Sequence, residues 1–226
     1  MNKKINQYIV FVAIALVVSC GNRQQQAAVV AEDAAFVQDV PEGWEALFDG
    51  NTLNNWEITS FGGEGEPYAR NGILTLPMAV SGNSTGIRWA GEPLPVNNFA
   101  IYYEARRIEG HDIFGGVTFP YNDEFASFIV GGWAGAVCGL SCIDGQDASS
   151  NESTKLIHFT RDRWYSIYLR VTTDSISAAI DDTIQVFNIA TAGKRIHPRA
   201  GTDARGLSFS TYRTTGQIRN LRLKRL

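Results

Sequence analysis

The sequence predicts an all-β protein, and specifically a β-sandwich, on three observations. Apolar and polar residues alternate with a period of two in one segment after another, which is typical of strands with one buried face. Polar turns separate these segments, and the chain of 226 residues contains 22 glycines. After residue 43 no segment of useful length has the 3.6-residue apolar period of a helix. Many short strands joined by turns favour two packed sheets.

The strands follow from this alternation in order along the chain. Residues 99–105 place Phe99 and Ile101 on one face and Tyr102 on the other. Residues 117–119 are expected to pair with 125–130 in a hairpin whose turn lies at 121–124. Further alternating segments lie at 165–171, 176–180, 184–187, 207–209 and 221–223.

The last strand contains a break in parity. Ile218 has the opposite parity to Leu221 and Leu223. Either a β-bulge lies near Asn220, or Arg219 points to the same face as the leucines. In the second case Arg219 is a candidate for contacts with a sugar or a carboxylate.

Both ends of the folded part carry a recognisable pattern. Residues 47–56 read Leu-Phe-Asp-Gly, two residues, Leu, two residues, Trp, and residues 219–223 read Arg-Asn-Leu-Arg-Leu. These patterns resemble the opening and the closing strand of the bacterial 3-keto-disaccharide hydrolase family. The resemblance implies a concanavalin A-like jelly-roll sandwich that acts on sugars whose carbon-3 hydroxyl is oxidised to a ketone. The middle of the chain departs from the family pattern, so no catalytic residue is carried over from it.

The first forty residues predict export and a lipid anchor. Lys3 and Lys4 precede an apolar run at 8–18 that is too short to span a membrane permanently. Residues 17–20 resemble a bacterial lipobox with Cys20 as the lipidated residue; the alternative is an ordinary signal peptide with an incidental cysteine. We expect a signal peptide at 1–20, a flexible tether at 21–40 and a β-sandwich domain at 41–226.

The expected localisation is therefore lipid-anchored, at the outer membrane and facing the periplasm or the cell surface. Gly21 follows Cys20, where an aspartate would favour retention in the inner membrane. Removal of residues 1–19 takes away two lysines, so the formal net charge moves from −3 to −5. This acidity argues against nucleic acid as a partner and against membrane binding other than through the lipid anchor.

Cys138 and Cys142 could pair in an oxidising compartment. Along an extended strand they would lie about 13 Å apart, too far for a disulfide. A disulfide therefore requires a turn at 139–141, and the alternative is a strand with two small apolar side chains.

The stretch 131–152 combines glycines, one tryptophan and three carboxylates, and is expected to form a loop. Sugar sites need this mixture, because an aromatic ring stacks on a pyranose and short polar side chains pair with its hydroxyls. Trp133 is the predicted stacking platform, and Asp144, Asp147 and Glu152 are predicted acid/base groups or polar contacts. No cofactor is expected, although the three carboxylates are also calcium-type ligands. The alternatives are a solvated loop and a Trp133 buried in the core.

Two further residues are candidates outside this stretch. His111 begins a strand beside Asp112 and is a candidate catalytic group. Arg213 follows Tyr212 and could hold an oxyanion of the substrate.

Three functions remain open at this point. The leading hypothesis is an exported lipoprotein that hydrolyses or eliminates a 3-keto-disaccharide or 3-keto-glucoside. The second is a noncatalytic carbohydrate-binding, lectin-like module, because the same sandwich serves both purposes. The third is a structural envelope lipoprotein without a sugar ligand.

Overall fold

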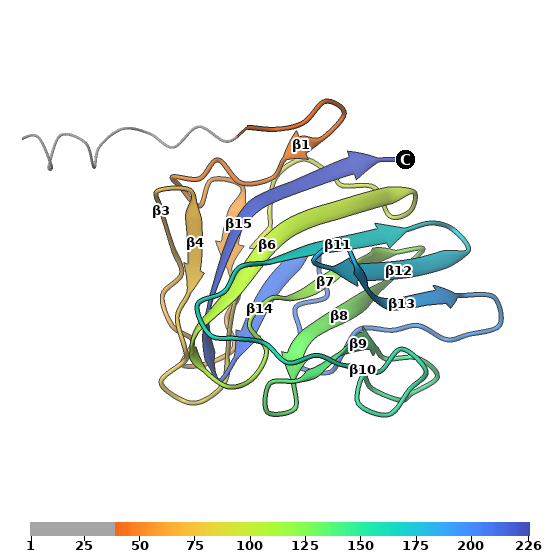
Figure 1. Ribbon diagram of the computed structural model, residues 1–226. Helices are drawn as coiled ribbons and strands as arrows, with labels where there is room; N and C mark the ends of the chain where they lie inside the picture. The colour runs from red at the N-terminus through yellow and green to blue at the C-terminus, as the bar shows by residue number, and fades with distance from the viewer. Residues whose placement is uncertain (1–38) are drawn as a thin grey trace, which may run out of the picture. The chain divides into compact units, whose positions relative to one another are not determined.

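The computed structural model describes residues 39–226, which fold into two antiparallel sheets packed face to face (Figure 1). This confirms the predicted all-β sandwich. The features predicted for residues 1–38, including lipidation of Cys20, lie outside the described residues. In the described part of the chain no helix is long and apolar enough to cross a membrane.

The first sheet, called sheet A, has eight strands. The two longest, β6 and β15, pair along most of their length in its middle (Figure 1). The order is β13 (Ile184–Ala190), β12 (Ser175–Ile180), β11 (Tyr165–Val171), β6 (Phe99–Gly110), β15 (Thr214–Arg225), β4 (Ile73–Leu76) and β3 (Tyr68–Arg70), with β1 (Glu45–Ala46) also paired to β15.

The second sheet, called sheet B, has seven strands. Its predicted hairpin is confirmed, because β7 pairs with β8 across a turn that begins after Tyr121. The order is β10 (Lys155–Leu156), β9 (Val137–Ser141), β8 (Glu124–Gly132), β7 (Gly116–Tyr121), β14 (Ser208–Tyr212), β5 (Ser84–Trp89) and β2 (Trp56–Ile58).

The core lies between the sheets and is made from the apolar positions of the alternation. On β6, Phe99 and Ile101 are buried, whereas Tyr102 on the opposite face is partly exposed. Sheet B contributes Phe128 and Phe209, and Phe209 packs edge-on against Tyr103 with ring centroids 5.0 Å apart. Each fully buried aromatic or aliphatic side chain of this kind contributes about 1.5–3 kcal/mol of transfer free energy.

The break in parity on β15 is a β-bulge. The pairing with β6 shifts register between Arg219 and Arg222, and Asn220 has a φ of 54°. The bulge turns Ile218 and Leu221 both toward the core, where each is fully buried. Arg219 therefore points to the outer face of sheet A.

The stretch 131–152 is not a single loop, which corrects the sequence-based expectation. Its middle forms β9, whose five residues are all buried. Cys138 lies in this strand and Cys142 just after it, and both are free thiols. Burial raises the pKa of the Cys138 thiol to about 12. The strand alternative for the cysteines is therefore the one in the structure, and because both faces of β9 are buried, no apolar–polar alternation marks it in the sequence.

Candidate functional site: the outer face of sheet B

A row of polar side chains crosses the outer face of sheet B from one edge toward the other. These positions alternate with core residues, so they point away from the core. The inter-strand register places them side by side in the order Glu57, Arg88, Ser208, Thr118, Ser127 and Ser141. The four hydroxyl side chains in this polar row are nevertheless buried.

The segment 196–206, which we call the covering segment, buries this polar row. At one edge of the sheet, Cys142 and His197 exchange backbone hydrogen bonds of 2.6 and 3.2 Å. In the middle, the Arg199 backbone N–H donates to Ser127 Oγ at 3.1 Å. Ser208 Oγ donates to the Asp203 carbonyl at 2.7 Å. The covering segment is therefore fixed to sheet B along its length.

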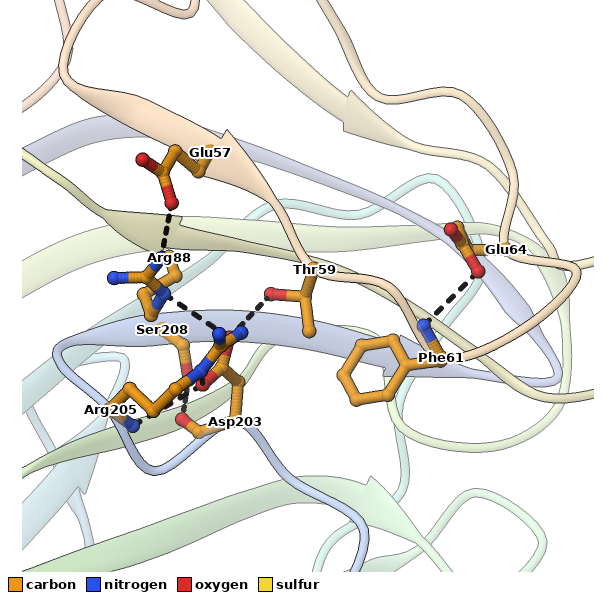
Figure 2. Close-up of polar contacts among 8 residues, drawn as sticks. All are labelled: Glu57, Thr59, Phe61, Glu64, Arg88, Asp203, Arg205 and Ser208. Carbon is orange, nitrogen blue, oxygen red and sulfur yellow. Dashed lines mark hydrogen bonds and ion pairs between the residues drawn. The ribbon is translucent and has the colours of Figure 1, made fainter.

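Asp203 holds the other end of the covering segment (Figure 2). Its carboxylate accepts two hydrogen bonds of 2.8 Å from Arg205 and one of 3.1 Å from Thr59, and it lies 3.4 Å from Arg88 Nε. Arg88 also pairs with Glu57. Burial acts to raise the pKa of Asp203, but these hydrogen bonds outweigh it and hold the pKa below the usual value. Asp203 is thus a charged anchor for the covering segment.

A shallow hollow opens beside the covering segment. Gly116 and Ser210, which face each other across β7 and β14, lie in it, and Arg199, Thr202 and Tyr212 also line it. Its enclosed volume is only about 10 Å³, roughly the space of one water molecule. A ligand the size of a six-membered ring would therefore rest on the rim of the hollow rather than inside it.

Trp133 stands beside this hollow in an unusual backbone conformation. Its φ is 48° and that of Ala134 is 65°, a region that bulky residues rarely occupy. The side chain is 37% exposed, and the Arg199 guanidinium stacks over its ring at 5.4 Å from the centroid. Among the described residues no carboxylate pairs with that guanidinium. Trp133 is therefore an exposed aromatic surface, not the core residue that the sequence left as an alternative.

Arg107 fixes the turn that carries Trp133. This buried side chain donates from Nη2 to three carbonyls, those of Asp112 at 3.2 Å, Gly131 at 3.4 Å and Gly135 at 3.1 Å. Burial lowers the pKa of Arg107. A Cβ at Gly131 would lie 2.7 Å from Arg107 Nη2, so only glycine fits there. Asp112 Oδ2 completes the turn by accepting from the Ala134 N–H at 3.1 Å.

The three predicted carboxylates lie at the β9 edge of sheet B, and none of them lines the hollow. Asp144 Oδ1 accepts from the Arg195 N–H at 2.8 Å, and Glu152 pairs with Lys194 at 2.6 Å. Asp147 accepts from Ser149 Oγ at 2.7 Å within its own turn. The described residues contain no group of three or more His, Cys, Asp or Glu side chains that could hold a metal ion.

The other predicted residues are divided between the two sheets. His111 and Arg213 are exposed and lie at the same end of sheet B as Trp133. Asp112, next to His111, accepts a hydrogen bond from the Ala134 N–H. Tyr212, next to Arg213, donates its backbone N–H to the Ile113 carbonyl. Arg219 lies on sheet A, where it pairs with Glu104 at 2.6 Å. The structure thus brings Trp133 near His111 and Arg213 and separates it from Arg219.

Sequence reasoning missed Arg107, Arg199, Tyr212 and Asp203. Tyr212 had a usable signal, because it follows the alternating segment that begins at Leu207. The other three act through contacts distant along the sequence, for which the alternation offers no signal.

The structural comparisons agree with this architecture. The Crh5 transglycosylase in complex with NAG has a TM-score of 0.57 at 10% identity, over 81% of this chain and 84% of that chain. The Ca²⁺/Man3GlcNAc-bound exoplasmic/lumenal domain of VIP36 has a TM-score of 0.52 at 10% identity, over 83% and 90%. A glycosyl hydrolase candidate from Parabacteroides distasonis ATCC 8503 has a TM-score of 0.50 at 13% identity, over 83% and 98%. At these identities the likeness establishes the fold, a concanavalin A-like sandwich.

The sequence comparisons identify the family. The search of curated proteins gave no match. The family model described as the 3-keto-alpha-glucoside-1,2-lyase-like domain, in contrast, matches residues 43–224. This range includes all strands in full except for Arg225, the last residue of β15, and it contains both end patterns found in the sequence. The chain belongs to the family of 3-keto-alpha-glucoside-1,2-lyase-like domains.

Proposed function

We propose that this domain acts on 3-keto glycosides, by elimination or hydrolysis of a 3-keto-disaccharide or 3-keto-glucoside, and that the hollow is its substrate site. The observation that carries the proposal is the Trp133–Arg199 stack beside Tyr212. An aromatic ring held in place offers stacking to a pyranose, and a guanidinium without a carboxylate partner offers N–H groups to a carbonyl oxygen. Family membership makes a 3-keto sugar the first substrate class to test.

The chemistry needs three contributions. A ketone at carbon 3 acidifies the hydrogen on carbon 2, so a base removes this proton and negative charge develops on the carbon-3 oxygen. The enolate then expels the oxygen at carbon 1, which takes up a proton as it leaves. Arg199 would hold the developing oxyanion, and Tyr212 would give or take the proton. Addition of water to the unsaturated product completes net hydrolysis.

The test is turnover of 3-keto-trehalose or a 3-keto-glucoside by purified protein. Tyr212→Phe and Arg199→Met should each reduce kcat by about a hundredfold or more. Tyr168→Phe is the matched control, because Tyr168 lies on the outer face of sheet A. Absence of turnover with the folded wild-type protein, or full activity in both hollow variants, would contradict the proposal.

A noncatalytic lectin-like role is the second candidate, and one observation favours it. None of the residues lining the hollow is a carboxylate or a histidine, the groups that most often transfer protons in enzymes. This role predicts affinity for unoxidised glycans, lost in Trp133→Ala, with no product formed from any 3-keto glycoside.

We also propose that the protein is exported and anchored by a lipid on Cys20. The lipobox-like residues 17–20 support this proposal. Cys20→Ser should move the protein from the membrane fraction to the soluble fraction. Unchanged membrane fractionation of this variant would count against the anchor.

A further inference from the structure

A second concavity, which we call the end pocket, lies on the other side of the covering segment from the hollow. The strands of sheet B run from one to the other. On β14, Ser210 and Tyr212 line the hollow, whereas Leu207, just before this strand, lines the end pocket. The covering segment borders both concavities, with Thr202 at the hollow and Arg205 at the end pocket. The end pocket has a volume of about 350 Å³, within the range of small-molecule sites.

One wall of the end pocket is apolar and fixed. Trp89 donates from Nε1 to the Glu92 carbonyl at 2.8 Å, and its ring packs edge-on against Trp56 at 5.2 Å. Leu94 and Val96 extend this wall, and Val96 is 49% exposed. Phe125 from β8 faces the same space. The interactions of Trp89 are independent of any ligand, so the wall is formed in advance.

The opposite side is polar and is tied to that wall. Asp123 from the β7–β8 turn and Glu124, the first residue of β8, line the pocket together with Arg205. Asn97 donates from Nδ2 to Asn122 Oδ1 at 2.8 Å, and its own Oδ1 accepts from the Asn122 N–H at 3.3 Å. This amide pair links the loop after β5 to the β7–β8 turn, so the two sides of the pocket keep their spacing.

We propose that the end pocket is a second saccharide site, which holds a neutral, unoxidised pyranose. The apolar wall suits the C–H face of a sugar ring, and the carboxylates of Asp123 and Glu124 suit its hydroxyl donors. An anionic ligand is disfavoured, because the one cation of the lining, Arg205, already pairs with Asp203. The pocket contacts neither Trp133 nor Tyr212, so this site is distinct from the hollow.

The experiment is calorimetric titration of the protein with neutral hexasaccharides of α-linked and β-linked glucose. Val96→Trp should fill the pocket and weaken binding by about tenfold or more. Val80→Trp is its matched control, because Val80 is 99% exposed and does not line the pocket, and it should bind like wild type. The double variant Asp123→Asn/Glu124→Gln should weaken binding without adding bulk, so the proposal remains testable if Val96→Trp does not fold.

Trp133→Ala and a turnover assay separate this proposal from the proposed function. Trp133→Ala should keep glucan binding, and Val96→Trp should keep any turnover of 3-keto glucosides. Three outcomes would overturn the inference: no glucan binds, binding survives both pocket variants, or Trp133→Ala removes binding as strongly as Val96→Trp. None of these outcomes depends on whether 3-keto glucosides are substrates.

Discussion

The two outer faces of the sandwich carry similar residue types but arrange them differently. On sheet A, Arg222 lies over Tyr102 at 4.1 Å and Trp44 at 5.3 Å. Arg106 and Arg219 both lie over Trp164, and Glu104 pairs with Arg219. The strands themselves supply most of these side chains, so the contacts are made within one sheet.

On the outer face of sheet B, charged and aromatic side chains of the same kinds contact the covering segment, which crosses the sheet. Asp203 ties this segment to Arg88 and Thr59, and Arg199 reaches over to Trp133. The polar row lies beneath the segment, and a concavity lies on each side of it. The comparison indicates that arginine–aromatic stacking alone does not make a site. On sheet B the crossing segment leaves the Trp133 ring and the Arg199 guanidinium partly open beside a hollow, and there we propose the substrate site.

The largest expected difference in unfolding free energy is between one carboxylate on each outer face, Asp203 on sheet B and Glu104 on sheet A. Asp203→Asn should lower the free energy of unfolding by about 3 kcal/mol, because it leaves the Arg88 side chain largely buried without this partner. Glu104→Gln should cost only about 1 kcal/mol or less, since its partner Arg219 is more exposed. Urea unfolding of the two variants measures the difference. Equal costs would mean that the covering segment contributes no more than a surface ion pair.

Neighbouring arginines on β6 provide a second contrast. Arg107→Met should cost about 2–3 kcal/mol, because three carbonyls, two of them buried, lose their donor, and it should also loosen the Trp133 turn. Arg106→Met is the matched control, as Arg106 stacks on Trp164 and donates to Gln217 on the outer face of sheet A. It should cost about 1 kcal/mol or less. If Arg107→Met retained full ligand response, the turn would not need this anchor.

The lowered pKa of Asp203 predicts that the free energy of unfolding depends on pH. The folded-state pKa is below the usual value, so this carboxylate stabilises the fold above about pH 4, and the contribution is lost as the pH falls through the folded pKa. The stability difference between wild type and Asp203→Asn should therefore be constant at about pH 6–8 and shrink on acidification. Unfolding experiments at a series of pH values measure it. If this stability difference grew toward low pH, the folded-state pKa of Asp203 would not be lowered, and Asp203 would not act as a charged anchor.

Most of the fold could be predicted from the sequence, because alternation is a local signal. Phe99 and Ile101 on β6 and the β7–β8 hairpin show it directly. β9 stayed one of two alternatives, because both of its faces are buried and no apolar–polar alternation marks it. The covering segment has no period at all, and its contacts span long separations, 75 residues from Ser127 to Thr202 and 144 from Thr59 to Asp203. Trp133, which composition predicts as a stacking platform, lies beside the hollow that we propose as the substrate site, but its partner Arg199 comes from such a distant contact.

The smallest expected change in stability is also the one that best separates the two faces. Trp133 and Trp164 are both stacked by arginine, at 5.4 Å on the sheet B side and at 4.2 and 4.5 Å on sheet A. Each →Ala substitution should cost about 0.5–1 kcal/mol, the range of an exposed cation–π contact. Only Trp133→Ala should remove the response to a hollow ligand, because only Trp133 stands beside that concavity. Turnover of a 3-keto-glucoside and its thermal shift, measured on both variants, provide the readout. A loss in Trp164→Ala with a normal response in Trp133→Ala would move the substrate site to the outer face of sheet A, where Arg219 stacks on Trp164.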